Sequence, residues 1–159
     1  MMKLSELIIP SAIVPQLEHT DRDGAIEELI DALIASRAVT KSLRGDLIKQ
    51  IIDRENKGST GFGKGVAVPH IKHAKIKGMV ATIGVSQQGV DFNALDKLPV
   101  YSIILLLSSD SNPDDHLQAM EKIFSNLQKD MFRRFMSQST TVEEIQDLIQ
   151  EADAQQLKG

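Results

Sequence analysis

The sequence predicts an α/β fold, a layered sandwich in which helices flank both sides of a mixed central β-sheet. Residues 99–108 are nearly all apolar, as expected for a central strand that is covered on both faces. Segments with the apolar spacing of amphipathic helices precede and follow a strand-like middle region. Because strands and helices do not alternate regularly along the chain, we expect a mixed sheet rather than a fully parallel one.

Two amphipathic helices are predicted before the strand region. Thr20 and Asp23 resemble a capping box at the start of the first helix. Its apolar face comprises Ile26, Leu29, Ile30, Leu33 and Ile34. The second helix follows Thr40 and ends near Gly58, which can supply a left-handed stop. Its apolar face comprises Leu43, Leu47, Ile48, Ile51 and Ile52. Upstream of both helices, residues 12–14 are expected to form an edge strand.

Three segments in the middle of the chain are predicted to be strands. Residues 66–68 form a short strand that Pro69 closes. Residues 79–86 show a period of two, which places one apolar set on one face of the strand. That set is Met79, Ala81, Ile83 and Val85. The third strand is the apolar segment 99–108.

Helical patterns return after the last strand. Asn112 is a favourable cap, followed by Pro113 and two acidic residues that suit a helix N-terminus. The apolar stripe of this helix comprises Leu117, Met120, Ile123, Phe124 and Leu127. A short helix is expected over residues 131–136. Thr141 with Glu144 forms a final capping box. The stripe that follows comprises Val142, Ile145, Leu148 and Ile149.

Composition is that of an ordinary globular protein, with 42% hydrophobic and 25% charged residues. We expect residues 1–159 to form a single domain. The formal net charge of -4 argues against nucleic acid as the main partner. The absence of cysteine excludes disulfides and thiolate chemistry. No apolar run is long enough to insert into a membrane, so a cytoplasmic location is expected.

The most unusual segment is the glycine-rich loop, residues 58–65, which contains four glycines. Gly58, Gly63 and Lys64 match a phosphate-loop pattern, but Gly65 replaces the Ser or Thr that would bind magnesium. A phosphate loop also opens a helix, whereas this loop leads into a predicted strand. The pattern therefore argues against a nucleotide-binding P-loop and against a dinucleotide fingerprint.

Three polar residues are candidates for chemistry, although each one alone also fits an ordinary surface position. His70 follows the loop and a strand, and Pro69 stiffens its approach. His116 lies in the first turn of a capped helix, where a neutral imidazole and free N–H groups suit an anion. Arg54 lies near a helix C-terminus. His19 and His73 are expected to be exposed. No partners that would complete a zinc site with His70 and His73 are apparent, and no nucleophile-elbow sequence supports a serine triad.

Taken together, these residues resemble the fructose/mannitol-type enzyme IIA domain of the bacterial phosphoenolpyruvate-dependent phosphotransferase system. The resemblance covers nearly the whole chain through five blocks in the right order and spacing. The blocks are Asp53-Arg54-Glu55, Thr60-Gly61-x-Gly63-x-Gly65-Val66-Ala67-Val68-Pro69-His70, Gly89-Val90-Asp91-Phe92, Asp96-x-x-Pro99-Val100 and Asp115-His116-Leu117. The family fold is a mixed sheet flanked by helices, in agreement with the pattern of elements.

The resemblance implies that His70 is phosphorylated, that Arg54 positions or neutralises the phosphoryl group, and that His116 is the second active-site histidine. The loop residues expected to line the phosphoryl site are Thr60, Gly61, Gly63 and Gly65. The implied donor is the histidine phosphocarrier protein HPr or its nitrogen-branch counterpart. No cofactor or metal is required. Phe62 and Ile71 depart from the residues common in the family, and either can alter partner fit.

Three functions remain open at this point. The first is a stand-alone regulatory enzyme IIA of the nitrogen-related type. The second is a sugar-specific component that passes the phosphoryl group to a cysteine of a IIB domain. The third is a non-catalytic α/β module whose glycine loop binds a nucleotide or metabolite. Lack of a cysteine and of a membrane segment indicates that neither IIB nor IIC is fused to this sequence, which favours the first.

Overall fold

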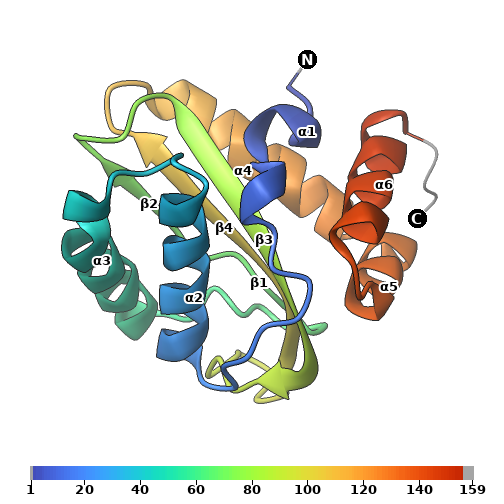
Figure 1. Cartoon of the computed structure of the whole chain (residues 1–159). Coiled ribbons are helices and arrows are strands. Elements are labelled where there is room, and N and C mark those ends of the chain that lie inside the picture. Colours follow the sequence, from blue (N-terminus) through green and yellow to red (C-terminus); the bar gives the residue numbers. More distant parts are fainter. Residues whose placement is uncertain (1, 156–159) are drawn as a thin grey trace.

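The computed structural model describes residues 2–155 as a β-sheet with helices on both faces (Figure 1). The strands are β1 (Val66–Ala67), β2 (His70–His73), β3 (Met79–Val90) and β4 (Val100–Ser109). The α-helices are α1 (Leu4–Leu7), α2 (Arg22–Ala35), α3 (Arg44–Lys57), α4 (Pro113–Leu127), α5 (Asp130–Gln138) and α6 (Val142–Asp153). Short 3-10 helices are η1 (Pro10–Ala12) and η2 (Lys41–Leu43). Among residues 2–155, no helix has the length and apolar character needed to cross a membrane.

The sheet is mixed, as predicted, and β4 is its central strand. β3 pairs with β4 in the antiparallel direction, with Met79 opposite Ser108. β1 and β2 both pair with β4 in the parallel direction, and their register is continuous: Val66 lies opposite Ser102 and His70 opposite Leu106. Because β3 occupies one side of β4, the two short strands lie one after the other along its opposite side.

The short strand that was predicted to close at Pro69 is only interrupted there. Proline has no N–H to donate, but its carbonyl still accepts a hydrogen bond from the Leu106 N–H at 3.0 Å. The chain then rejoins the ladder as β2. Because β4 continues past this point, it offers pairing partners that the local sequence does not show.

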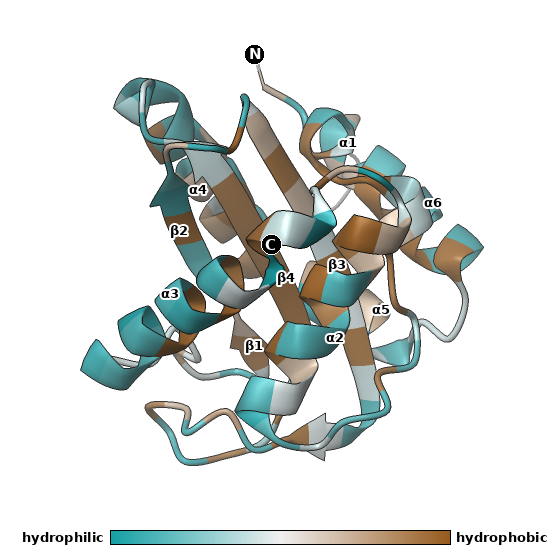
Figure 2. Ribbon diagram, turned by 60° about the vertical axis from the view of Figure 1, so that its left-hand side comes forward, coloured by the Kyte–Doolittle hydropathy of each residue, from teal (hydrophilic) through white to brown (hydrophobic). Residues whose placement is uncertain are grey.

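Side chains of β4 alternate between two buried clusters, which confirms the layered sandwich. Ile103, Leu105 and Leu107 pack with the cluster that includes α2 and α3. Ile104 and Leu106 pack with the cluster that includes α1, α4, α5 and α6. Figure 2 shows the resulting concentration of hydrophobic residues along β4 between the helical layers.

Three local predictions about the helices are wrong. Asp21, not Thr20, caps α2 by accepting from the Gly24 N–H. Gly58 has a φ of 167°, so α3 ends in extended rather than left-handed backbone. Leu117, placed in the buried stripe of α4, is 58% exposed. The predicted caps Asn112 and Thr141 are confirmed, because each accepts a hydrogen bond from the backbone N–H three residues later.

The segment before α2 runs along the outer edge of β3. The N–H groups of Ile9, Val14 and Leu17 donate to β3 carbonyls at 2.8–2.9 Å. The edge strand predicted over residues 12–14 is therefore only partly present, because Ala12 lies in η1 while Val14 forms an isolated parallel bridge with Gly84.

Candidate functional site

His70 is half-buried at the first position of β2. It lies opposite Leu106, so its side chain projects from the sheet face that α4 covers. Its Nδ1 lies 2.7 Å from the Val68 carbonyl oxygen. Since a carbonyl oxygen only accepts, Nδ1 carries a proton and donates it. In a neutral ring this leaves the lone pair of Nε2 available for bonding.

His116 approaches His70 from the first turn of α4. The two ring centroids are 5.6 Å apart, and the ring planes are inclined by 45°. His116 is buried, so it does not occupy the ordinary surface position that its local sequence alone also fits. Its Nδ1 is hydrogen-bonded to the hydroxyl of Ser108 on β4. Burial, followed by the electrostatic effects of His70 and Lys72, lowers the pKa of His116 and favours its neutral form.

Lys72 is a cationic neighbour that the sequence reasoning did not single out. It lies opposite Ser108 in the parallel ladder, two positions after His70, so both side chains project from the same face. Its charge is one of the causes of the lowered pKa of His116. The alternation His70-x-Lys72 would have revealed it, had residues 70–73 been read as a strand.

Arg54 is exposed in the last turn of α3. Its Nη1 donates to the Gly58 carbonyl at 2.8 Å, which fixes the guanidinium beside the helix end. Among residues 2–155, Arg54 makes no described contact with His70 or His116. Its role at the phosphoryl group stays a prediction.

A buried carboxylate connects α3 with the segment that holds His70. Glu55 is 2% exposed, and it accepts from the Thr60 N–H at 3.0 Å and from the Thr60 hydroxyl at 2.7 Å. The Thr60 carbonyl in turn accepts from the Val68 N–H at 3.4 Å, and the Val68 carbonyl holds His70. Thr60 therefore positions the histidine through the backbone, and its hydroxyl is already engaged.

The glycines of the loop pack toward the segment before β4. A Cβ added to Gly61 would lie 3.0 Å from the Ala94 Cβ. Gly63 and Gly65 have φ values of +114° and +76°, which side chains rarely adopt. Gly65 precedes His70 by five residues, or roughly 16 Å of extended chain. No described contact joins Gly63 or Gly65 to either histidine, and their place at the phosphoryl site stays a prediction.

The other two histidines form local pairs. His73 is buried, contrary to expectation: its Nε2 lies 2.6 Å from Asp46 Oδ2, and its Nδ1 accepts from the Lys75 N–H. It lies three positions after His70 on the same strand, so its side chain projects from the opposite face of the sheet. His19 is exposed and pairs with Glu28 at 2.7 Å. Within residues 2–155, no cluster of three or more potential ligands suits a metal ion.

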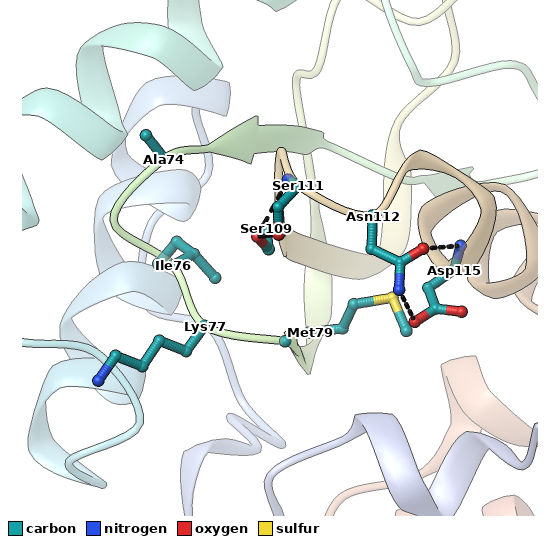
Figure 3. A pocket seen from close by; sticks show the side chains of 9 residues that line it. Ala74, Ile76, Lys77, Met79, Ser109, Ser111, Asn112 and Asp115 are labelled. Carbon is teal, nitrogen blue, oxygen red and sulfur yellow. Dashed lines mark hydrogen bonds between the residues drawn. The ribbon is translucent and has the colours of Figure 1, made fainter.

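A hollow of about 430 Å³ lies near the site without including either histidine. Figure 3 shows it between the β2–β3 turn with Ile76, the first residue of β3 (Met79), and the start of α4, where Asn112 donates to Asp115. Its polar side chains are largely bonded to one another, as with Ser109 and Ser111 at 2.7 Å. We therefore place the candidate site at the histidine pair on the sheet face rather than in this hollow.

Comparisons with known proteins agree on one family. The family described as "Phosphoenolpyruvate-dependent sugar phosphotransferase system, EIIA 2" matches residues 6–152. A nitrogen regulatory protein of Bradyrhizobium diazoefficiens is 31% identical over 77% of this chain and 78% of its own. The fructose-specific EIIABC component of Bacillus subtilis is 27% identical over 96% of this chain, which spans only 24% of that protein. The crystal structure of nitrogen regulatory protein IIA-Ntr from Neisseria meningitidis has a TM-score of 0.82 and 27% identity, covering 92% of this chain and 98% of that one.

Proposed function

The chain belongs to the EIIA type 2 family of the phosphoenolpyruvate-dependent sugar phosphotransferase system, a family of phosphoryl carriers, and we propose that His70 is its phosphoryl acceptor. The observation that carries this assignment is the hydrogen bond from His70 Nδ1 to the Val68 carbonyl. It fixes the tautomer in which Nε2 has a free lone pair. The half-buried position of the ring leaves it accessible to the phosphohistidine of an HPr-type donor.

The transfer step exchanges one N–P bond for another. Nε2 of His70 attacks the phosphorus atom of the donor phosphohistidine, and the donor imidazole leaves with the electron pair of the broken bond. The proton on His70 Nδ1 remains in place. The ring gains positive character as the new bond forms, so the hydrogen bond to Val68 strengthens in the transition state. Because both bonds are phosphoramidates, the equilibrium constant can lie near one.

Neighbouring groups supply the charge that a phosphoryl group requires. If the Ser108 hydroxyl donates to Nδ1 of His116, the neutral His116 ring carries its proton on Nε2 and can donate it to a phosphoryl oxygen. The Lys72 ammonium adds a positive charge on the same sheet face. Arg54 is assigned a further charge-assisted contact with the incoming group.

We assign a regulatory output to the phosphorylation state and a cytoplasmic location to the protein. Relatives named as nitrogen regulatory proteins support the first assignment, because they align with this chain over most of their own lengths. In this function, the protein with a phosphorylated His70 and the protein with an unmodified His70 bind different target proteins. The donor is HPr or its nitrogen-branch counterpart.

Intact-mass measurement after incubation with phosphoenolpyruvate, enzyme I and HPr tests the assignment of His70. We expect one phosphoryl adduct on the unaltered protein and on a His19→Ala control, and no adduct on His70→Ala. NMR of the product should locate the phosphorus on Nε2. An adduct that survives His70→Ala, or phosphorus on Nδ1, would contradict the assignment.

Sugar-specific transfer is the second candidate function. The fructose-specific relative supports it, since the matched part of that protein aligns with 96% of this chain. Here the phosphorylated protein passes its group to a cysteine of a fructose- or mannitol-type IIB domain. Mixing the phosphorylated protein with a purified IIB domain separates the two outputs, because rapid loss of the adduct to IIB favours sugar-specific transfer.

A further inference from the structure

A second hollow, of about 210 Å³, lies between the glycine-rich loop and α5. Its walls include Lys64 and Gly65 from the loop, Ser102 from the start of β4, and Arg134 from α5. Ser102 and Leu106 are four residues apart on β4, so the hollow lies roughly 13 Å along the strand from the level of His70. It is separate from the proposed phosphoryl site.

Ser102 gives this hollow an unsatisfied hydrogen-bonding group. The residue is 1% exposed, and within residues 2–155 its hydroxyl has no hydrogen-bond partner. The side chain projects from the same sheet face as Ile104, which is the face that α5 covers. Buried hydroxyls are normally hydrogen-bonded, because leaving one without a partner is destabilising. A ligand in the hollow would supply the missing partner.

Positive charge dominates the same hollow. Lys64, Arg133 and Arg134 line it together with a single acid, Asp130. Asp130 accepts from Arg133 at 2.9 Å and from Arg134 at 3.1 Å, so one carboxylate is shared by two guanidinium groups. Three cations against one anion leave a local excess of two positive charges in a chain whose formal charge is -4.

The loop backbone is shaped to bring these groups together. Lys64 has a φ of +63°, an uncommon conformation for a residue with a side chain. Its N–H donates to Asp96 at 3.3 Å, which helps to hold that turn. Gly65 has a φ of +76°, a conformation that favours glycine, and it faces the ring of Tyr101 on β4. The backbone conformation of this turn therefore accounts for Gly65, which no described contact connects to His70.

We propose that this hollow is a binding site for a small phosphate-type anion, either inorganic phosphate or a phosphomonoester. The ligand oxygens would accept from the Ser102 hydroxyl, the Lys64 ammonium and the Arg134 guanidinium. Tetrahedral phosphate offers acceptors in several directions, and guanidinium groups bind it in a bidentate manner. The site does not depend on the assignment of His70.

Titration of the isotopically labelled full chain with inorganic phosphate, followed by amide NMR shifts, tests the proposal. We expect saturable shifts at Lys64, Gly65 and Ser102, and the same shifts in His70→Ala. The only tyrosine of the chain, Tyr101, lines the hollow and there is no tryptophan, so tyrosine fluorescence gives a second readout. A parallel titration with glycerol 3-phosphate distinguishes free phosphate from a phosphomonoester by which of the two binds more tightly.

Two variants and a matched control complete the test. Ser102→Ala and Arg134→Gln should each raise the dissociation constant about tenfold. Lys49→Gln should leave it unchanged, since Lys49 forms an exposed i,i+4 ion pair with Asp53 just as Arg134 does with Asp130. The proposal is wrong if phosphate produces no saturable shift, if the shifts centre on His70 and His116, or if Lys49→Gln weakens binding as much as Arg134→Gln.

Discussion

At His116, burial and the electrostatic effects of two neighbouring basic residues act in the same direction. Transfer of the ring out of water disfavours its charged form, and the electrostatic effects of His70 and Lys72 disfavour that form further, so the pKa of His116 lies below its ordinary value. The folded protein therefore binds a proton here less readily than the unfolded chain does. The resulting contribution to stability is present above the ordinary histidine value of 6.5 and is lost as the pH falls through the lowered one.

Because this contribution to stability is lost as the pH falls, it leads to a prediction about His116→Gln. As the pH is lowered from about 7.5 to about 5.5, the free energy of unfolding should fall more steeply in the unaltered protein than in the variant. His19→Gln is a control of opposite sign, because a hydrogen bond to Glu28 raises the pKa of His19. Urea denaturation at several pH values measures the slopes. Equal slopes for the unaltered protein and His116→Gln would contradict the assigned shift.

Arg54 allows a test that separates chemistry from folding. Its side chain is exposed and makes one described hydrogen bond, to the Gly58 carbonyl. Arg54→Ala should therefore lower the free energy of unfolding by less than about 1 kcal/mol. Loss of a charge that stabilises the moving phosphoryl group should slow phosphorylation by about tenfold or more.

Lys57→Ala is the matched control, since Lys57 is an exposed cation in the same turn of α3. Single-turnover phosphorylation by phosphorylated HPr gives the rates. If both variants are slowed equally, Arg54 contributes only general surface charge, and its specific role is refuted.

At the scale of elements, Glu55 connects the end of α3 to the loop that leads to His70. Glu55→Ala would leave the buried N–H and hydroxyl of Thr60 without their partner. We expect a loss of about 2–3 kcal/mol in the free energy of unfolding, measured by urea denaturation. Asp53→Ala, which removes an exposed acid of the same helix, should cost less than about 1 kcal/mol. A cost for Glu55→Ala as small as that for Asp53→Ala would show that the buried link is unimportant.

The contrast between α4 and β2 shows how far the sequence could predict these elements. The start of α4 was predictable because Asn112, Pro113 and the acids after them act within one turn of chain. β2 was not, because it exists through pairing with β4, more than thirty residues away in the sequence. Lys72 and Ser108 were missed for the same reason. The pairing of β2 with β4 brings Lys72 to the site, and the packing of α4 against β4 brings His116 to the Ser108 hydroxyl.

His70, in contrast, could be proposed as a candidate from the sequence, because the residues that position it are its neighbours. The Val68 carbonyl that sets its tautomer is two positions away. A role at the phosphoryl group was assigned to Arg54 only through the family resemblance, and the structure gives its guanidinium a local partner, Gly58. Glu55 appeared within a family block, but its buried bond to Thr60 depends on how α3 meets the loop.

At the scale of the whole molecule, β4 belongs to both buried clusters. Ile103 and Ile104 are adjacent in sequence, yet they pack into opposite helical layers. If either helical layer separated from β4, it would expose one apolar face of this strand. The other layer packs on the opposite face of the same strand, so it would lose part of its support. We therefore propose that the chain unfolds as one cooperative unit, which is the behaviour of a single domain.

Truncation of either isoleucine tests this cooperativity. Ile103→Ala and Ile104→Ala should each lower the free energy of unfolding by about 2–5 kcal/mol, because both side chains are fully or almost fully buried. In each variant, far-ultraviolet circular dichroism and the fluorescence of Tyr101, which lies on β4, should report one coincident transition in urea. Two separated transitions, or a helical signal that persists after the tyrosine fluorescence has changed, would show that the two layers are independent folding units.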